Sequence, residues 1–191
     1  LKRLEFSGRK FCIVTDSTVA PLYLNTVKKE LERCACFVTS YVLPAGEENK
    51  TLEQVQGIYQ HLIEMHFDRK DFLVALGGGV VGDMTGFAAA TYLRGIDFIQ
   101  VPTTLLAQVD SSIGGKAGVD FLKYKNMVGA FHQPRMVYMN VSTLCTLPLE
   151  QFSCGMGEVV KHGFIRDAPI PVGCMKTVPK YLPLTRIPFP R

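Results

Sequence analysis

The feature that most constrains the fold is an apolar run that leads directly into three glycines. Phe72 to Leu76 is a short unbroken hydrophobic segment, typical of a strand covered on both faces, and Gly77-Gly78-Gly79 follows it at once. Residues 80–92 are mostly small and apolar, which favours a helix packed tightly on a sheet. A strand, a glycine turn and a helix in succession predict one unit of a parallel sheet.

The same alternation runs along most of the chain. Further strands are expected at residues 11–14, 36–43, 98–101 and 135–139, and helices at 20–33 and 51–66, the latter capped by Thr51 with Gln54 at the capping-box position. We therefore expect an α/β fold over residues 1–141, a Rossmann-like, mainly parallel sheet with helices on both faces. Residues 142–168, with a helix at 149–165, should open a helical domain. Residues 169–191 hold six of the 11 prolines and should form an irregular tail.

Charge and composition exclude several classes of function. The net charge of +4 comes from four basic residues in 169–191, which leaves 17 basic and 17 acidic side chains before them, so no basic surface for nucleic acid is expected. No apolar run approaches the roughly 18–20 residues that cross a bilayer. Six scattered cysteines without a C-x-x-C pair indicate reduced thiols in an intracellular protein, in cytoplasm or plastid stroma.

Polar clusters follow the expected strands, where the ligands of parallel sheets bind. Gly78 and Gly79, at the start of a helix, would let a diphosphate approach the backbone, although a tight turn is the plain alternative. Asp16 could accept a ribose hydroxyl, and Glu47 and Lys50 could do similar work. Taken singly, these three serve equally well as loop caps or solvated charges.

The segment from Val109 to Lys116 combines an acid, two serines, two glycines and a lysine, and is expected to be one loop that closes on an anionic, polyhydroxylated ligand. Lys125 and Asn126 could add donors to the same ligand. Near the C-terminus, Glu158, Lys161 and His162 share one helix face, and their spacing alone favours a surface ion pair over a metal site. The other histidines are expected to be structural.

Three motifs in order, GGGVVGD, RGIDFIQVPTTLLAQVDSSIGGK and GEVVKHGFIRDA, resemble 3-dehydroquinate synthase, as do VTDSTVAPLY and PAGEENK nearer the N-terminus. The resemblance covers residues 4–168. It implies a Rossmann-like domain and a helical domain that enclose NAD and a divalent metal, zinc or cobalt. It also implies a sugar phosphate substrate, 3-deoxy-D-arabino-heptulosonate 7-phosphate, and a product, 3-dehydroquinate, that feeds the shikimate pathway to aromatic compounds.

The resemblance also assigns residues. It implies that Glu158 is a metal ligand, which reverses the interpretation from spacing, and it does not imply His162. The implied NAD contacts are Asp16, Glu47, Lys50, Gly78, Gly79, Asp83, Thr103, Thr104 and Lys125, and the implied substrate contacts are Lys116, Lys161, Asn126 and Asp110. A homodimer is left open.

The chain departs from the family pattern at Thr18, where the family usually has Asn, and at Asp120 to Tyr124. The resemblance stops near Ala168, and the two histidine ligands of the family lie beyond that point. We therefore expect a truncated N-terminal portion with little or no turnover. The alternatives are a related metal-dependent polyol or alcohol dehydrogenase, and a remnant that binds nucleotide without catalysis.

Overall fold

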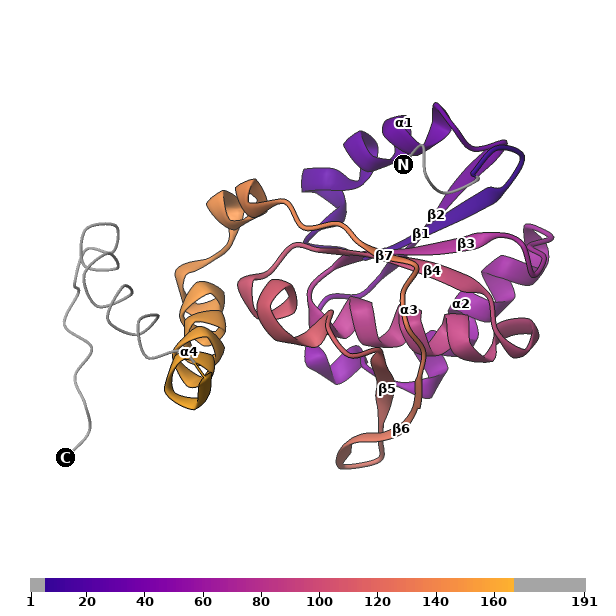
Figure 1. Cartoon of the computed structure of the whole chain (residues 1–191). Coiled ribbons are helices and arrows are strands. Elements are labelled where there is room, and N and C mark those ends of the chain that lie inside the picture. Colours follow the sequence, from indigo (N-terminus) through magenta and orange to yellow (C-terminus); the bar gives the residue numbers. More distant parts are fainter. Residues whose placement is uncertain (1–5, 167–191) are drawn as a thin grey trace.

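The structure, a computed structural model, describes residues 6–166 and is built around a five-stranded parallel sheet (Figure 1). The strands follow the order β2-β1-β3-β4-β7, and each pairs with its neighbours in parallel. The predicted strands are confirmed in place, with ends that shift by a few residues. Their bounds are β1 Lys10–Asp16, β2 Phe37–Leu43, β3 Phe72–Gly77, β4 Asp97–Pro102 and β7 Met136–Val137.

Helices cover both faces of this sheet, as predicted. In Figure 1, α1 (Asn25–Glu32) lies above the sheet, and α2 (Leu52–Glu64) and α3 (Gly79–Thr91) lie below it. Alternate residues of β1 face the two layers. Cys12 and Val14 belong to the core between the sheet and helices α2 and α3, and Phe11 and Ile13 belong to the core between the sheet and α1. Unbroken apolar strands are therefore required, because both sides of each central strand are buried.

The local signals for the helices also hold. The Thr51 hydroxyl accepts a hydrogen bond from the Gln54 backbone N–H at 3.3 Å and caps α2. The helix expected at residues 20–33 is divided into a π-helical turn, Ala20–Leu24, and α1. Short 3-10 turns cover Glu47–Asn49 and Tyr92–Arg94.

A hairpin that the sequence did not predict projects from the sheet domain beside α3. Its strands are β5 (Lys116–Phe121) and β6 (Tyr124–Phe131), paired antiparallel. Ala117 and Val119 are buried against α3, whose Gly86 leaves room for the Ala117 methyl group. The expectation of one loop from Val109 to Lys116 is therefore wrong, because a π-helical turn spans Ala107–Ser111 and Lys116 already belongs to a strand.

The last described elements lead away from the sheet. A 3-10 turn over Val141–Thr146 is capped by Asn140, whose side-chain oxygen accepts the Ser142 backbone N–H at 3.0 Å. The predicted final helix is present as α4 (Leu149–Arg166). None of the helices within residues 6–166 is long and apolar enough to cross a bilayer. The proline-rich segment 169–191 lies outside the described residues.

Candidate functional site

The strand order has a switch point between β1 and β3. From β1 the chain passes to β2 on one side, and it then returns to β3 on the other side of β1. Open parallel sheets bind ligands at the carboxyl ends of the strands beside such a switch point. Asp16 ends β1, and Gly77 ends β3 directly before α3. The polar residues predicted at the strand ends therefore share one edge of the sheet.

The glycines of this edge allow three segments to approach closely. A Cβ on Gly78 would lie 3.1 Å from the Thr104 side chain, and one on Gly79 would lie 3.0 Å from the Ser111 hydroxyl. Gly78 occupies the N-cap position of α3 without any side chain to fill it. The start of α3, with its free N–H groups, consequently faces the loops that follow β4.

Asp16 and the two threonines perform structural work at this edge. One carboxylate oxygen of Asp16 accepts the backbone N–H groups of Thr18 at 2.8 Å and Val19 at 2.9 Å, as expected for a loop cap. Thr103 is buried, and its backbone N–H donates to the Gly77 carbonyl at 2.9 Å. The Thr104 hydroxyl accepts the Ala107 backbone N–H at 3.2 Å.

Lys50 lies at the centre of the site. Its side chain is only 5% exposed, and its ammonium group donates to Asp83 Oδ2 and to Asn126 Oδ1, each at 2.5 Å. Lys50 follows β2, Asp83 lies in the first turns of α3 and Asn126 belongs to β6. One buried charge therefore joins three segments. No sequence signal predicts this contact, because the residues are distant along the chain.

The Asp83 carboxyl is held in a mixed environment. Burial raises its pKa above the ordinary value, and the hydrogen bond and charge of Lys50 oppose that rise without cancelling it. The acid needs its lysine partner to remain ionised at low cost, because a buried charge without a partner is unfavourable. The pair thus presents an ammonium group and a carboxylate beside the start of α3.

Two further contacts hold the hairpin to the segment around Lys50. The backbone N–H of Asp120 donates to the Lys50 carbonyl at 2.9 Å, and Asp120 Oδ1 accepts the Asn126 backbone N–H at 2.7 Å. Asn126 adopts a left-handed conformation, with φ of 55°. Lys125 pairs with Glu47 at 3.2 Å on the exposed rim. The hairpin is therefore a fixed wall of the site.

A cavity of about 550 Å³ opens between α3, the π-helical turn Ala107–Ser111 and the hairpin of β5 and β6. Four of the predicted residues line it, namely Asp83, Asp110, Lys116 and Asn126. Asp16 and Thr104 are not among its lining residues, and they stay at the strand edge. The structure therefore divides the predicted residues into a strand-edge group and a cavity group, joined by Asp83.

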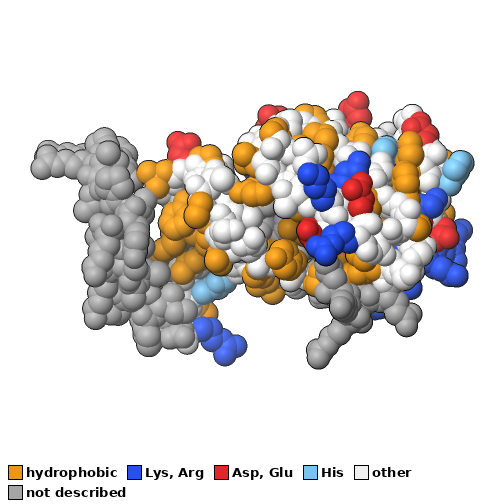
Figure 2. Space-filling view, turned by 90° about the horizontal axis from the view of Figure 1, so that it is seen from above, with side chains coloured by type: hydrophobic (Ala, Val, Ile, Leu, Met, Phe, Trp, Pro, Cys, Tyr) orange, Lys and Arg blue, Asp and Glu red, His pale blue; other side chains and the backbone are white. Residues whose placement is uncertain are grey.

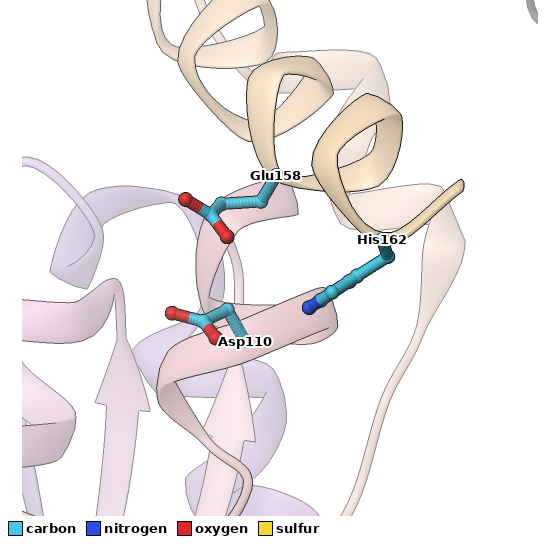
Figure 3. A group of neighbouring side chains, drawn as sticks. All are labelled: Asp110, Glu158 and His162. Atoms are coloured by element: carbon cyan, nitrogen blue, oxygen red, sulfur yellow. The ribbon is translucent and has the colours of Figure 1, made fainter. Parts of the chain in front are cut away.

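Helix α4 brings a third group of residues close to Asp110, at the side of the cavity. Glu158 and Lys161 form an ion pair on one face of α4, as the spacing predicted. On the same side, one ligand atom each from Asp110, Glu158 and His162 lies within 4.8 Å of the others (Figure 3). The helical spacing predicts that Glu158 and His162 share a face, but it does not predict the approach of Asp110, which depends on how α4 packs.

Two further histidines, His132 and His61, have structural surroundings. His132 stacks on Phe98, with ring centroids 5.4 Å apart, and its Nε2 lies 2.8 Å from the Ile96 carbonyl. His61 forms a hydrogen bond with the Thr39 hydroxyl at 3.0 Å. The five cysteines in the described part of the chain are free, as predicted for reduced thiols.

Comparison with known proteins identifies the family. The profile of the 3-dehydroquinate synthase N-terminal domain matches residues 40–154 of this chain. The chain belongs to the 3-dehydroquinate synthase family. The predicted resemblance is therefore confirmed, and the matched residues include the glycine turn, the π-helical turn and the whole hairpin.

Relatives in this family match the chain over most of its length. It is 54% identical over 160 residues to a 3-dehydroquinate synthase from Ruminiclostridium cellulolyticum, and the aligned region covers 84% of this chain and 45% of that protein. It is 55% identical over 159 residues to one from Symbiobacterium thermophilum, and here the aligned region covers 83% of this chain and 44% of that protein. The chain thus spans less than half the length of these curated relatives.

Solved structures agree with the fold. A 2-deoxy-scyllo-inosose synthase in complex with carbaglucose-6-phosphate, NAD+ and Co2+ superposes with a TM-score of 0.79 at 33% identity, over 83% of this chain and 43% of that one. A 2-epi-5-epi-valiolone synthase from Streptomyces hygroscopicus with NAD+ and Zn2+ superposes with a TM-score of 0.78 at 30% sequence identity, over 85% of this chain and 46% of that one. A glycerol dehydrogenase from Schizosaccharomyces pombe superposes with a TM-score of 0.60 at 14% sequence identity, over 76% of this chain and 35% of that one. This last similarity shows a shared fold alone.

Proposed function

We propose that this chain forms the nucleotide-binding part of a 3-dehydroquinate synthase. The reaction would convert 3-deoxy-D-arabino-heptulosonate 7-phosphate to 3-dehydroquinate and phosphate, with NAD regenerated in each cycle. One observation carries the proposal: Lys50 joins Asp83 and Asn126 between the glycine turn and the cavity that Lys116 lines. A dinucleotide at the strand edge would therefore meet a sugar phosphate in the cavity.

The strand-edge group fits NAD. The diphosphate would lie on the Gly78 and Gly79 backbone at the start of α3, where N–H groups and the helix dipole favour negative charge. Asp16 keeps a second carboxylate oxygen that could accept ribose hydroxyls while the first caps the loop. The other proposed contacts are Glu47, Lys50, Asp83, Thr103, Thr104 and Lys125. The two related synthases that were solved with NAD+ support NAD as the ligand.

The cavity group fits a phosphorylated polyol. Lys116 and Lys161 would hold the phosphate by charge-assisted hydrogen bonds. The contact with Glu158 raises the pKa of Lys161 above its usual value, so Lys161 remains a cation at neutral pH. Asp110 and Asn126 would accept and donate hydrogen bonds with ring hydroxyl groups and so orient the sugar.

The chemistry needs groups that the side chains do not provide. Bound NAD would supply the temporary oxidation of a ring hydroxyl, and a divalent metal, zinc or cobalt, would supply Lewis acidity. The carboxylates of Asp110 and Glu158 with the His162 imidazole are a donor set that suits such a metal. The residues of this chain would bind, orient and neutralise the phosphate while it leaves.

The extent of the two domains follows from this function. We propose residues 1–141 as the nucleotide domain and residues 142–168 as the beginning of a helical domain that presents α4 to the cavity. Exposed hydrophobic residues gather at the α4 end of the molecule (Figure 2), among them Val141, Leu149, Phe164 and Ile165. The need for NAD and the free cysteines support an intracellular location, in the cytoplasm or the plastid stroma.

The polyol dehydrogenase alternative has less support. The likeness to glycerol and alcohol dehydrogenases shows a shared fold only, whereas the cavity is lined by a lysine, Lys116, that suits a phosphate group. A remnant that binds NAD without catalysis would differ from the synthase only in having no turnover. Release of phosphate from the sugar phosphate would indicate the synthase, accumulation of NADH with a polyol would indicate the dehydrogenase, and neither reaction would indicate the remnant.

Calorimetry with NAD+ tests the proposal first. We expect saturable binding that Gly78→Val abolishes, because the new side chain would meet Thr104. Gly157→Ala is the matched control, since open space surrounds that position, and it should bind like the parent chain. No heat at millimolar NAD+ from the parent chain would contradict the proposal.

Phosphate release then tests the reaction. With the heptulosonate phosphate, NAD+ and Co2+, we expect slow release of phosphate and no accumulation of NADH. Turnover should be slow because the described residues leave the cavity open, with Phe131 of its lining 83% exposed, and water is not excluded. Accumulation of NADH with glycerol, and none of the phosphate release, would instead favour the dehydrogenase.

A further inference from the structure

A buried glutamine lies inside the π-helical turn and reaches the segment that leads to α4. Gln108 is 6% exposed. Its side-chain nitrogen donates to the Pro102 carbonyl at 3.2 Å, to the Asn140 carbonyl at 3.3 Å and to the Thr143 hydroxyl at 3.1 Å. Pro102 ends β4, and Thr143 belongs to the 3-10 turn that precedes α4. One amide group therefore ties the end of β4 to the start of the proposed helical domain.

The surroundings of this amide require a hydrogen-bond donor. The carbonyls of Pro102 and Asn140 can only accept hydrogen bonds. The Thr143 hydroxyl uses its own hydrogen to donate to the Asn140 carbonyl at 2.8 Å, so it too can only accept from Gln108. The two N–H bonds of Gln108 thus serve three acceptors. Thr143 is also buried, at 7% exposure, so loss of the amide would leave buried acceptors short of a donor.

The same turn carries Asp110 to the cavity. Whereas Gln108 is buried, Asp110 is exposed and lines the cavity. A hydrogen bond of 3.1 Å from the Ser112 backbone N–H to the Ala107 carbonyl closes the turn around both residues. Wide turns of this kind are rare in proteins and are frequent at functional sites. A shift of the turn would therefore move Asp110 relative to the cavity.

Helix α4 rests on the start of the same segment. A Cβ on Gly155 would lie 2.6 Å from the Leu105 side chain and 2.7 Å from the Leu106 backbone nitrogen, so α4 packs directly against the backbone there. In Figure 3, Asp110 faces the side of α4 that carries Glu158. The sheet, the cavity and α4 therefore meet at the π-helical turn, and Gln108 holds that turn from its buried side.

We propose that Gln108 is a positioning residue, whose buried amide fixes the π-helical turn at the boundary of the two proposed domains and so holds Asp110 in place for the sugar phosphate. The inference deepens the proposed function and rests on it, because Asp110 is there a contact of the sugar. The described residues that line the cavity do not include Gln108, so it acts through Asp110.

Two substitutions remove the donor at nearly constant size. Gln108→Glu keeps the shape, but its carboxylate would face three acceptor oxygens with no hydrogen to donate. Gln108→Met keeps the length without any polar group. In both variants the turn is no longer held in the geometry that binds the sugar, and binding must restore it. The loss of such a buried hydrogen-bond donor corresponds to about a tenfold change in affinity.

Calorimetry with the heptulosonate phosphate, on chain saturated with NAD+, measures the effect on the cavity. We expect Gln108→Glu and Gln108→Met to bind the sugar phosphate at least about tenfold more weakly than the parent. The affinity for NAD+ should change by less than about threefold, because the Thr103 backbone N–H still donates to the Gly77 carbonyl at 2.9 Å. Gln60→Met, the same exchange at an exposed position of α2, is the matched control and should bind both ligands like the parent.

A double-mutant cycle shows whether Gln108 acts through Asp110. Asp110→Ala removes the contact with the sugar, so Gln108→Met in that background should weaken sugar phosphate binding by less than about twofold more. A general loosening of the fold would instead weaken binding by the same factor in both backgrounds. Thr143→Val removes one acceptor at constant shape and should lower the affinity about threefold, which provides a test even if the Gln108 variants do not fold.

The outcomes separate this inference from the proposed function. Unchanged sugar phosphate affinity in Gln108→Met or in Thr143→Val, equal losses for NAD+ and sugar phosphate, or additive losses with Asp110→Ala would each overturn the role of Gln108. The proposed function would survive these results, because the parent chain would still bind both ligands. A parent chain that binds no sugar phosphate would refute the proposed function together with the inference that rests on it.

Discussion

Replacement of Lys50 by methionine is the sharpest test of how the site is held together. The substitution keeps the unbranched side chain as far as Cε but removes the ammonium group that faces Asp83 and Asn126. Loss of one partner from a buried ion pair costs about 3–5 kcal/mol. The Asp83 side chain retains 21% exposure, so the lower end applies, and we expect a loss of about 3 kcal/mol. With a urea slope of about 1.5 kcal/mol/M, the unfolding midpoint should fall by about 2 M.

A double-mutant cycle separates the lost pair from a simple packing defect. Because the stranded carboxylate of Asp83 causes most of the damage, Lys50→Met with Asp83→Asn should be more stable than Lys50→Met alone by at least about 1 kcal/mol. Equal midpoints for the single and double variants in urea unfolding would refute the reasoning, since packing alone would then explain the loss.

The pH dependence of Lys50→Met has a defined sign. Burial already raises the pKa of Asp83, and without Lys50 the opposing effect is removed. A carboxyl group whose folded pKa is raised favours the folded state most when protonated. The stability deficit of the variant should therefore shrink as the pH falls through that raised pKa, and a deficit that grows toward acid would contradict the assignment.

Three further perturbations follow from other parts of the structure. Asp120→Ala should weaken NAD+ binding about fivefold to tenfold in calorimetry, because the Asn126 backbone N–H loses its charged acceptor, and Asp120→Asn should restore most of the affinity. Burial raises the pKa of the Cys12 thiol from 9.0 to about 12, so Cys12 in the native protein should resist alkylation, which mass spectrometry would measure. The free energy of unfolding should also decline as the pH rises from 9 toward 12, and it should decline less in Cys12→Ala. Gly155→Val should push α4 away from Leu105 and weaken Co2+ binding about tenfold with little change in circular dichroism, and unchanged affinity would refute the packing argument.

The sequence predicted the sheet because its signals are local. Strands buried on both faces need unbroken apolar runs such as Phe72 to Leu76, and α2 begins where Thr51 can cap it. The residues at the strand ends follow from the same argument, since parallel strands end at one edge. These features require no knowledge of distant contacts.

The hairpin was missed because its signals are weak. Its turn has Leu122 at φ of 55°, where glycine or asparagine would be expected. Gly118 and Gly129 face each other across the strands, where added Cβ atoms would meet the partner's backbone, and this pair was the available clue. The meeting of Asp110 with Glu158 had no such clue, because it depends on packing between α4 and the π-helical turn.

Lys50 contacts Asp83, which lies 33 positions further along the chain, and Asn126, which lies 76 positions further along. These contacts limit how the sequences of related chains can change during evolution. A shorter side chain at position 50 would fall short of both acceptors, and an arginine would bring a wider group into a space fitted to one nitrogen. An apolar residue at position 83 would leave the buried Lys50 ammonium group without its charged partner. Substitutions at positions 50 and 83 should therefore occur together, as a correlated pair, whenever a related chain abandons this arrangement.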